Sequence, residues 1–497
     1  GLIATGTADP TNGCEICQPG TLATGYSPVN DATPCQTNGN YCKAGACIFG
    51  CYVGGKLFDA GDSSPTNVCD VCAASTVGQP VMAFSPTTVT TQCNENGGTY
   101  CAQGACIPVC LIGATFYDAG APDPTDPDQC CNPATPGAWT PGFASAITTP
   151  STTGTPAAVA IGDVTGDGIP DLIVGETPPG QVEILKGAGD GTFSLLPNPI
   201  AFPTGASSLV VADFNNDGYQ DLAVASNGGN SITILLYEAD GGFVSSSMND
   251  IFKKPIALLV ADLQQPGSHD LIVGAANSAL VPEVVTLINQ GGSFTLGSTA
   301  TLVDGVVALT PGDFNGQSNE VDVAALGAHG VTIVAITGAG TTITPGVPVP
   351  LTTSNVVAGA SGNLDGHPNG VSDLAVADAQ NNQVIPLLNG SSGLAAQAAL
   401  AVNAPTAAAV ADLNGDGKPD VAAAGTSVGG TSDVLVFINQ TVGSASSLTF
   451  FTPVGAYVVG AQPVALAVGD LNGDGRPDLV TASGGNDNLS VLLGQCP

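Results

Sequence analysis

Basic residues are scarce in this chain of 497 residues. Seven Lys and Arg stand against 41 Asp and Glu, which gives a formal net charge of −34. This charge argues against nucleic acid as a partner, because proteins that bind nucleic acid present basic patches to its phosphates. It argues equally against anionic lipid surfaces, which attract clusters of Lys and Arg. Apolar runs are short as well, and none reaches the roughly 18 residues that a membrane-spanning helix needs.

Residues of common catalytic motifs are also missing. The chain has three histidines, and it contains no G-x-S-x-G elbow, no H-E-x-x-H pair and no Walker loop. Two of the histidines, His269 and His367, lie in Asp-rich segments that look like loops. We interpret them as loop residues rather than catalytic bases. The sequence therefore predicts a protein that is not an enzyme.

Cysteine is confined almost entirely to the segment 1–131, which holds 14 of the 15. Six positions recur in the same order further along this segment, and a third copy breaks off. The two sets are Cys14, Cys17, Cys35, Cys42, Cys47 and Cys51, then Cys69, Cys72, Cys93, Cys101, Cys106 and Cys110. This density is typical of a disulfide framework in an oxidising compartment, although the pairing cannot be read from sequence. We predict a disulfide-rich domain of about two and a half repeats over residues 1–131.

Two other roles for the CxxC pairs are less favoured. Zinc is bound by some CxxC pairs, but Cys14 and Cys17 stand far from Cys69 and Cys72 in the chain, and each pair lies inside a larger Cys repeat. Attachment of a c-type haem requires a histidine directly after the second cysteine. Gln18 and Ala73 occupy those places, which excludes haem.

An Asp-rich segment is what the chain has in abundance. In "GDLNGDGRPDLV" (469–480), Asp470, Asn472, Asp474 and Asp478 occupy positions 1, 3, 5 and 9 of a loop, and Gly475 occupies position 6. Oxygens at alternate positions of a tight loop can converge on one point, and the glycine permits the sharp turn. Calcium is held by six to eight oxygens in loops of this kind. A turn without metal is the alternative for a single copy, because Asp, Asn and Gly favour turns.

Related segments start at 163, 213, 262, 313, 363 and 412, and this regular spacing indicates a repeat architecture. With the last segment, four are complete, and we predict that they bind calcium through these residues: Asp163, Thr165, Asp167 and Asp171; Asp213, Asn215, Asp217 and Asp221; Asp412, Asn414, Asp416 and Asp420; Asp470, Asn472, Asp474 and Asp478.

Three middle segments depart from the pattern. The third has Pro266 where the position 5 carboxylate should be, so we expect no calcium there. The fourth and fifth carry insertions, and we expect weaker sites formed by Asp313, Asn315 and Asp322, and by Asn363, Asp365, Asn369 and Asp373.

Each repeat contains four short apolar runs bounded by Gly, Asn, Asp and Pro, which read as strands. Four strands per repeat make one propeller blade, with the Asp-rich loop joining the first two strands. We therefore predict an all-β protein with a seven-bladed β-propeller over residues 132–497. Only two strand signals follow the last loop. We expect the segment 141–150, which contains Phe143, to supply the missing outer strand and close the ring, since closure protects strand edges.

These repeats resemble the FG-GAP/VCBS class, the calcium-loop propeller repeats of integrin alpha subunits and of many secreted bacterial proteins. The resemblance covers about residues 141–495, and the Cys-rich region before it is of a secreted bacterial type. It implies that the loops bind calcium and stiffen the blades, while function varies among members.

Two functions remain open from the sequence. The first is self-assembly into a fibre or surface layer. If Cys51 and Cys110 are counted as the first cysteines of the second and third repeats, the first repeat holds only five of six positions, Cys14, Cys17, Cys35, Cys42 and Cys47. An odd cysteine in a secreted protein points to intermolecular pairing or a free thiol. We expect another subunit to complete this N-terminal repeat. The second is a lectin or adhesin that binds a surface glycan or protein. A secreted enzyme with carboxylates in the propeller pore is a third, less favoured reading.

Aromatic residues, on which sugars stack, make up only 5% of the chain. Trp139, Tyr219, Tyr237 and Tyr457 are isolated in the sequence, and we interpret them as packing residues. We also predict a disulfide between Cys496 and Cys130 or Cys131, which would lock the ring closure. The chain starts at Gly1 without Met. We expect an extracellular or cell-surface protein whose signal peptide has been removed.

Overall fold

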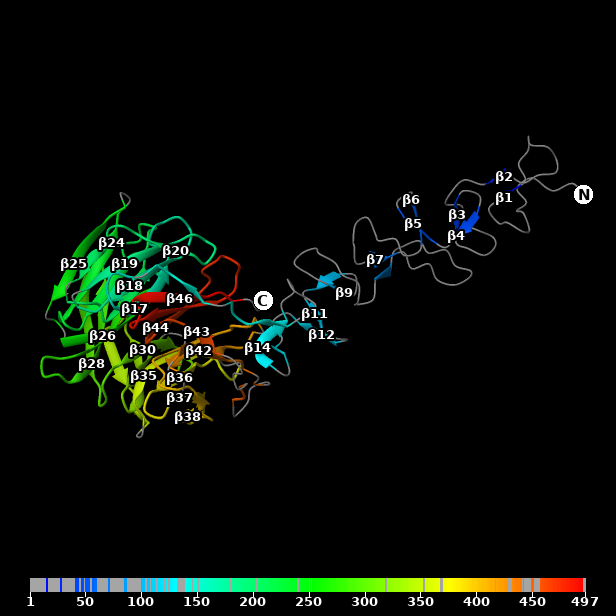
Figure 1. Ribbon diagram of the computed structural model, residues 1–497. Helices are drawn as coiled ribbons and strands as arrows, with labels where there is room; N and C mark the ends of the chain where they lie inside the picture. The colour runs from blue at the N-terminus through cyan, green and yellow to red at the C-terminus, as the bar shows by residue number, and fades with distance from the viewer. Residues whose placement is uncertain are drawn as a thin grey trace, which may run out of the picture. The chain divides into compact units, whose positions relative to one another are not determined.

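The computed structural model describes residues 142–494 apart from short gaps. The gaps are 145, 151, 179, 203, 239–240, 250, 252, 318–319, 352–353, 367–369, 416, 427–430, 440, 442–447 and 451–455. Before residue 142 only strand pairings are described, and Cys496 lies beyond the described residues. The predicted Cys496 bridge therefore stays a prediction. The chain divides into two compact units, Gly1–Ala119 with Cys131–Trp139, and Gly120–Cys130 with Thr140–Pro497. Figure 1 shows both units.

The strand pairs before residue 142 are short and antiparallel. They follow the repeat of the sequence, since β3 (Tyr41–Lys43) pairs with β4 (Ala46–Ile48) and β9 (Tyr100–Ala102) pairs with β10 (Ala105–Ile107). Four further pairs are β1 (Glu15–Ile16) with β2 (Ser27–Pro28), β5 (Gly50–Val53) with β6 (Lys56–Asp59), β7 (Asp70–Val71) with β8 (Ser85–Pro86), and β11 (Val109–Ile112) with β12 (Thr115–Asp118). In addition, β13 (Pro122–Asp123), β14 (Asp126–Cys131) and β15 (Trp139–Pro141) form a three-stranded sheet.

Seven antiparallel sheets form the propeller, which confirms the predicted fold. Blade 1 is β17 (Pro156–Gly162), β18 (Asp171–Glu176), β19 (Gly180–Gly187), β20 (Phe193–Leu195) and β21 (Ile200–Phe202). Blade 2 is β22 (Ser208–Ala212), β23 (Asp221–Ser226), β24 (Ser231–Tyr237) and β25 (Phe243–Asn249). Blade 3 is β26 (Lys253–Ala261), β27 (Asp270–Ala276), β28 (Pro282–Asn289) and β29 (Phe294–Thr301). Blade 4 is β30 (Ala308–Gly312), β31 (Val321–Gly327), β32 (Gly330–Thr337), β33 (Thr342–Pro345) and β34 (Val349–Pro350).

The remaining blades follow the same order. Blade 5 is β35 (Val356–Gly362), β36 (Asp373–Asp378), β37 (Gln383–Gly390), β38 (Gly393–Ala396) and β39 (Leu400–Ala401). Blade 6 is β40 (Ala407–Ala411), β41 (Asp420–Thr426), β42 (Ser432–Phe437) and β43 (Tyr457–Val458). Blade 7 is β44 (Pro463–Gly469), β45 (Asp478–Ser483), β46 (Asn488–Leu492) and β16 (Ile147–Thr148).

The ring closes in blade 7, where strands from the two ends of the propeller pair. Ile147 of β16 lies opposite Val491 of β46, and Phe143 forms a bridge with Gly494. Phe143 is buried and packs edge-on against Tyr457 of blade 6, with ring centroids 5.4 Å apart. The outer edge of blade 7 is therefore covered by a strand that precedes blade 1 in the chain.

The hydrophobic core is divided among the seven boundaries between neighbouring blades. Each apolar cluster joins two consecutive blades, and the second strand of a blade contributes to both of its boundaries. In β18, Leu172 faces blade 7 and Ile173 faces blade 2, because successive side chains of a strand point to opposite sides. Complete burial of such side chains contributes about 1.5–3 kcal/mol each. This accounts for the continuous apolar runs at the second strands.

Antiparallel order gives the ring two distinct faces. The Asp-rich loops between first and second strands, and the turns between third and fourth strands, lie at one face, which we call the loop face. The turns between second and third strands lie at the other, which we call the turn face. In the part of the chain that the structure describes, no helix is long and apolar enough to span a membrane.

Candidate functional site: the aspartate loops and an inter-blade pocket

The Asp-rich loop of blade 7 is a compact turn organised by its position 1 carboxylate. Asp470 Oδ1 accepts hydrogen bonds from the backbone N–H of Gly473 (2.7 Å) and Asp474 (3.1 Å), and its Oδ2 accepts one from Gly475 (2.8 Å). Gly475 has φ = 82°, a conformation that side chains rarely adopt. Asp474 Oδ1 in turn accepts from Arg476 N–H (2.9 Å). The predicted oxygens at positions 1 and 5 are thus held on one exposed turn.

Blades 1 and 2 repeat this arrangement around Asp163 and Asp213. In blade 1 a lysine of the third strand lies beside the loop. Lys186 Nζ lies 2.8 Å from Asp167, and this ammonium group lowers the pKa of Asp167. In blade 2 the position 3 amide instead donates to the position 5 carboxylate, from Asn215 Nδ2 to Asp217 Oδ2 (2.8 Å).

The position 9 aspartates lie in the sheets rather than on the exposed turns. Asp478 is fully buried, and its Oδ2 accepts from Leu471 N–H (2.8 Å) while its Oδ1 accepts from Gly494 N–H (2.7 Å). It therefore ties the loop to the third strand of the blade. Burial raises the pKa of Asp478 to about 6. Burial likewise raises the pKa of Asp373 to about 6, and the pKa values of Asp171, Asp221 and Asp322 are raised for the same reason.

Blade 3 shows that the position 9 brace does not depend on a complete loop. Its loop has Pro266 at position 5, yet Asp270 is fully buried and makes both connections. Its Oδ2 accepts from Leu263 N–H (3.0 Å) and its Oδ1 from Asn289 N–H (2.7 Å). The sequence contains a signal for this brace, because an aspartate recurs at the end of all seven loops. We predicted only the role of a metal ligand for it.

In the incomplete loops, polar groups bond to one another and to the neighbouring blade. In blade 3, the backbone N–H of His269 donates to Asp262 Oδ1 (3.0 Å), and His269 Nδ1 lies 2.6 Å from the Asp213 carbonyl oxygen of blade 2. In blade 4, Asn315 Nδ2 donates to Asp322 Oδ1 (3.0 Å), while Asp313 accepts from Gly316 N–H (2.6 Å).

The loops of blades 5 and 6 are described only in part. In blade 5, Asp365 is buried, and its N–H donates to Asp373 Oδ2 (3.1 Å); Asn369 lies outside the described residues. In blade 6, Asp412 Oδ2 accepts from Gly417 N–H (2.8 Å) and Asn414 is buried. Asp420 accepts from Leu413 and Asn439, while Asp416 lies outside the described residues.

The loops fit a hard cation in the kind of donor that they offer. Their side chains at positions 1, 3 and 5 supply carboxylate, amide or hydroxyl oxygens, the ligands that calcium takes. Within the described residues, however, no group of three or more His, Cys, Asp or Glu side chains is gathered as a metal centre. At position 9 of blade 7, backbone N–H groups hold the carboxylate in the sheet. When bound, calcium would supply charge neutralisation at positions 1 and 5.

Asparagines at the ends of three third strands connect neighbouring blades, and sequence reasoning missed them. Each donates from Nδ2 to the carbonyl of the residue after position 1 in the preceding blade. The three bonds are Asn289 to Phe214 (2.8 Å), Asn389 to Phe314 (2.8 Å) and Asn439 to Leu364 (2.7 Å). The backbone N–H of the same asparagine donates to the position 9 aspartate. Each asparagine therefore links its own blade to the loop of the preceding blade.

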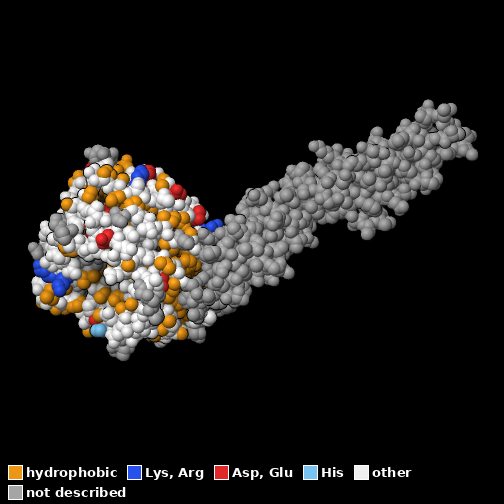
Figure 2. Space-filling view, in the orientation of Figure 1, with side chains coloured by type: hydrophobic (Ala, Val, Ile, Leu, Met, Phe, Trp, Pro, Cys, Tyr) orange, Lys and Arg blue, Asp and Glu red, His pale blue; other side chains and the backbone are white. Residues whose placement is uncertain are grey.

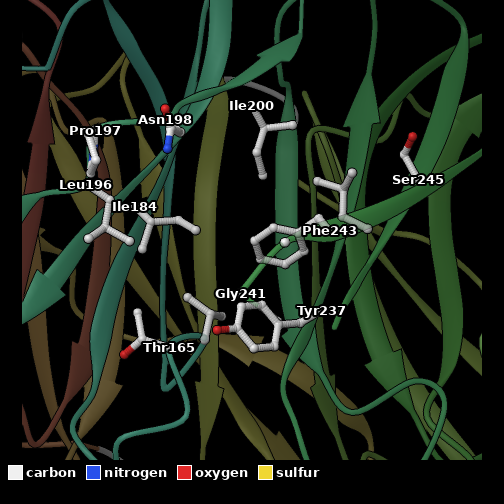
Figure 3. A pocket seen from close by; sticks show the side chains of 13 residues that line it. Thr165, Ile184, Leu196, Pro197, Asn198, Ile200, Tyr237, Gly241, Phe243 and Ser245 are labelled. Carbon is white, nitrogen blue, oxygen red and sulfur yellow. The ribbon is translucent and has the colours of Figure 1, made fainter. Parts of the chain in front are cut away.

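A pocket of about 420 Å³ lies between blades 1 and 2, beside the loop of blade 1. Figure 3 shows Tyr237 and Phe243 on the blade 2 side, with Ile184 and Leu196 of blade 1 across from them. The two rings are edge-to-face with centroids 5.3 Å apart. Polar atoms at the wall come from Thr165, Asn198 and Ser245. Tyr237, which looks isolated in the sequence, thus belongs to an aromatic wall.

The architecture defines a class, the seven-bladed propellers with an Asp-rich loop between the first two strands of a blade. Comparison with protein families agrees. A model of the FG-GAP-like repeat matches residues 163–224 and 412–481, and a model of the FG-GAP repeat matches residues 205–245. The chain carries FG-GAP repeats, and its described domain is an FG-GAP β-propeller. FG-GAP repeats are typical of extracellular and surface proteins.

Other comparisons add the following. A search of curated proteins returned no match. Among solved structures, one match is the crystal structure of BBS1N in complex with ARL6DN, soaked with lead. It is 14% identical in sequence, covers 72% of this chain and 97% of that chain, and superposes with a TM-score of 0.49.

Proposed function

We propose that the protein is a non-enzymatic, calcium-stabilised extracellular propeller that acts as a structural, self-associating protein. The observation that supports this proposal is the arrangement of loops at the loop face. Seven Asp-rich loops lie there around one ring, and each is bonded to a buried aspartate of its own blade. A cation bound at a loop would neutralise charge on a segment that is already tied to the scaffold. It would thereby stabilise the blade rather than activate a substrate.

Calcium has a defined thermodynamic signature in this proposal. A ligand that binds only the folded state stabilises it by RT ln(1 + [L]/Kd), about 2.7 kcal/mol at a hundredfold excess over Kd. Addition of a chelator should lower the melting temperature of the propeller, and calcium should restore it. An unchanged melting curve after verified removal of calcium would refute the calcium part.

The second part of the proposal is self-association. We predict that the N-terminal Cys-rich region forms the contact between copies. Negative-stain electron microscopy of the native protein in calcium should show fibres or layers. Deletion of residues 1–13 should weaken assembly and leave the propeller folded. Native protein that stays monomeric at high concentration under non-reducing conditions would refute this part alone.

Glycan binding is the second candidate, and the inter-blade pocket favours it. One face of a pyranose ring is apolar and stacks on aromatic side chains, while its hydroxyl groups bond to amides and hydroxyls. The wall formed by Tyr237 and Phe243, with Asn198 and Ser245 nearby, offers both kinds of group. A glycan array with the wild-type protein and Tyr237→Ser tests the idea. Binding lost in Tyr237→Ser and retained in Val244→Ser, an exposed control on β25, would support it.

A further inference from the structure

Acidic side chains are distributed unequally between the two faces of the ring. Within the described residues, the exposed acids of the loop face are Asp167, Asp190, Asp217, Glu238, Asp262, Asp313 and Asp474. At the turn face the described acids are buried or half-buried, as Glu176, Asp378 and Asp487 illustrate. The exposed negative charge of the described propeller therefore belongs to the loop face.

Basic residues lie at both faces. At the loop face, Lys186 contacts Asp167 and the guanidinium of Arg476 lies 3.9 Å from Asp474, so these cations sit among carboxylates. At the turn face, Lys253 and the exposed Lys254 stand side by side at the start of β26 in blade 3. Figure 2 shows a blue patch bordered by orange side chains at the left edge of the propeller.

Exposed apolar side chains lie in the same part of blade 3. We call this surface the blade 3 rim, and it consists of Ile251, Lys253, Lys254, Leu280, Val281 and Val303. Val303 is 90% exposed and Leu280 is 59% exposed. Backbone pairing brings the pieces together. Lys253 pairs with Ala276, from which the turn carrying Leu280 begins, and Leu302 N–H donates to the Pro282 carbonyl (2.8 Å) beside that turn.

Leu280 has a backbone conformation that its side chain disfavours. It has φ = 61°, a left-handed conformation that disfavours large side chains and that Asn and Asp tolerate best. The corresponding turns of three sister blades are one residue shorter, and their left-handed residues are Asn230 (φ 48°), Asn382 (φ 55°) and Asp487 (φ 49°). Blade 3 thus accepts backbone strain and exposes a leucine where its sisters have polar residues. Strain of this kind is concentrated at binding and switch regions.

We infer that the blade 3 rim docks on the loop face of a second copy of this chain. The inference rests on the self-association proposed above and names a contact for it on the propeller. Two lysines bordered by apolar side chains fit a surface that exposes carboxylates. The loop face is such a surface, and its exposed Asp190 and Glu238 lie outside the predicted calcium positions. Because the contact joins unlike surfaces, a pair of copies retains one free loop face and one free rim. Such heterologous contacts propagate into filaments unless they close into a ring.

The first experiment uses the full-length protein in calcium and measures assembly against concentration by light scattering and electron microscopy. Leu280→Asn installs the residue type of the sister turns, so we expect it to fold at least as well as the wild type. We expect it, and the double variant Lys253→Glu/Lys254→Glu, to raise the concentration needed for assembly about tenfold or more. Val347→Asn is the matched control, because Val347 is 89% exposed and lies in blade 4 outside the rim.

The second experiment identifies the surface that receives the rim. Zero-length carbodiimide cross-linking joins lysines to carboxylates in contact, and links from Lys254 to loop-face peptides such as 213–221 of another copy are expected. A rim variant added in small amounts should shorten wild-type filaments, because it caps one end through its intact loop face. Links from Lys254 to the Cys-rich repeats instead, or assembly unchanged in both rim variants, would overturn the inference and leave self-association standing. A wild-type protein that never assembles would overturn both.

Discussion

Asn439 in blade 6 donates a hydrogen bond from Nδ2 to the carbonyl oxygen of Leu364 in blade 5, at 2.7 Å. The same amide group reaches the Pro419 carbonyl (2.9 Å), and the Asn439 backbone N–H bonds to Asp420. One fully buried side chain thus joins two blades and the position 9 brace. Such bonds, together with the apolar clusters at each boundary, stabilise the packing of adjacent blades.

Replacement of this asparagine should destabilise the propeller. Asn439→Ala leaves the buried Leu364 carbonyl and the half-buried Pro419 carbonyl without their donor. An unsatisfied buried polar group costs about 1–3 kcal/mol. The free energy of unfolding, measured by urea denaturation, should fall by that amount. Asn227→Ala, at an exposed turn of blade 2, is the control and should change stability little. Equal stability of the two variants would contradict the role assigned to Asn439.

The position 9 brace of blade 3 should stabilise the fold without any metal. Asp270→Ala removes acceptors for the Leu263 and Asn289 N–H groups and for the Ser268 hydroxyl (2.6 Å). Bonds to a buried carboxylate contribute about 1.5–3 kcal/mol each, so the melting temperature should fall clearly. The fall should be equal in calcium and in chelator, because Pro266 replaces the position 5 ligand. A loss seen only in calcium would show that this loop binds the metal.

Most of the fold followed from the sequence because its determinants are local and repeated. Asp478 and its six counterparts lie at or next to the start of each second strand. The regular spacing of the Asp-rich loops indicates the number of blades. Residues such as Leu172 and Ile173, buried on both sides of a strand, read as continuous apolar runs. These signals do not depend on which blade is the neighbour, so the number of blades can be predicted from the sequence alone.

Contacts between blades were not predictable in the same way. Asn439 reads as a turn residue, and its partner Leu364 belongs to the loop of another blade, far earlier in the chain. The pocket beside Tyr237 was not predictable, because Leu196 in its wall comes from another blade. The exposure of Leu280 depends on how the turn face is covered, which no local pattern encodes. The calcium prediction remains open for a different reason, because it depends on a ligand as well as on the chain.

Calcium dependence should be concentrated in the complete loops. Asp474→Ala removes the position 5 carboxylate of blade 7, the blade in which the ring closes. The difference in melting temperature between calcium and chelator should therefore shrink in this variant. Pro266→Ala, at the same position of the blade 3 loop, is the matched control and should keep the wild-type difference. The prediction fails if both variants respond to calcium as the wild type does.

A pair of buried glutamates at the turn face of blade 1 should make stability depend on pH. Glu176 and Glu183 are each 1% exposed, and they meet the segment that enters β17. Gly154 N–H donates to Glu176 Oε1 (2.8 Å), and the Thr153 hydroxyl donates to Glu183 Oε1 (2.6 Å). Burial raises the pKa of Glu176, and repulsion from Glu183 and Asp487 acts in the same direction.

The sign of the effect follows from linkage. A carboxyl group whose pKa is higher in the folded state binds its proton more tightly there, so it stabilises the fold at low pH. That contribution is complete below the ordinary glutamate value of 4.5 and is lost as pH rises through the higher folded value. Glu176→Gln removes the charge but keeps an oxygen for Gly154 N–H. At pH 7 in chelator it should raise the melting temperature by about 2 °C.

The gain should disappear near pH 4, where Glu176 of the wild type is itself protonated. Melting curves recorded from pH 4 to 7.5 in chelator compare the wild type with Glu176→Gln, and with Glu238→Gln as a control at an exposed glutamate of the loop face. The chelator keeps metal binding at the loops out of the comparison. Curves for Glu176→Gln and the wild type that stay parallel over the whole range would show that Glu176 titrates as an ordinary glutamate, and its burial beside Glu183 would then have no energetic consequence.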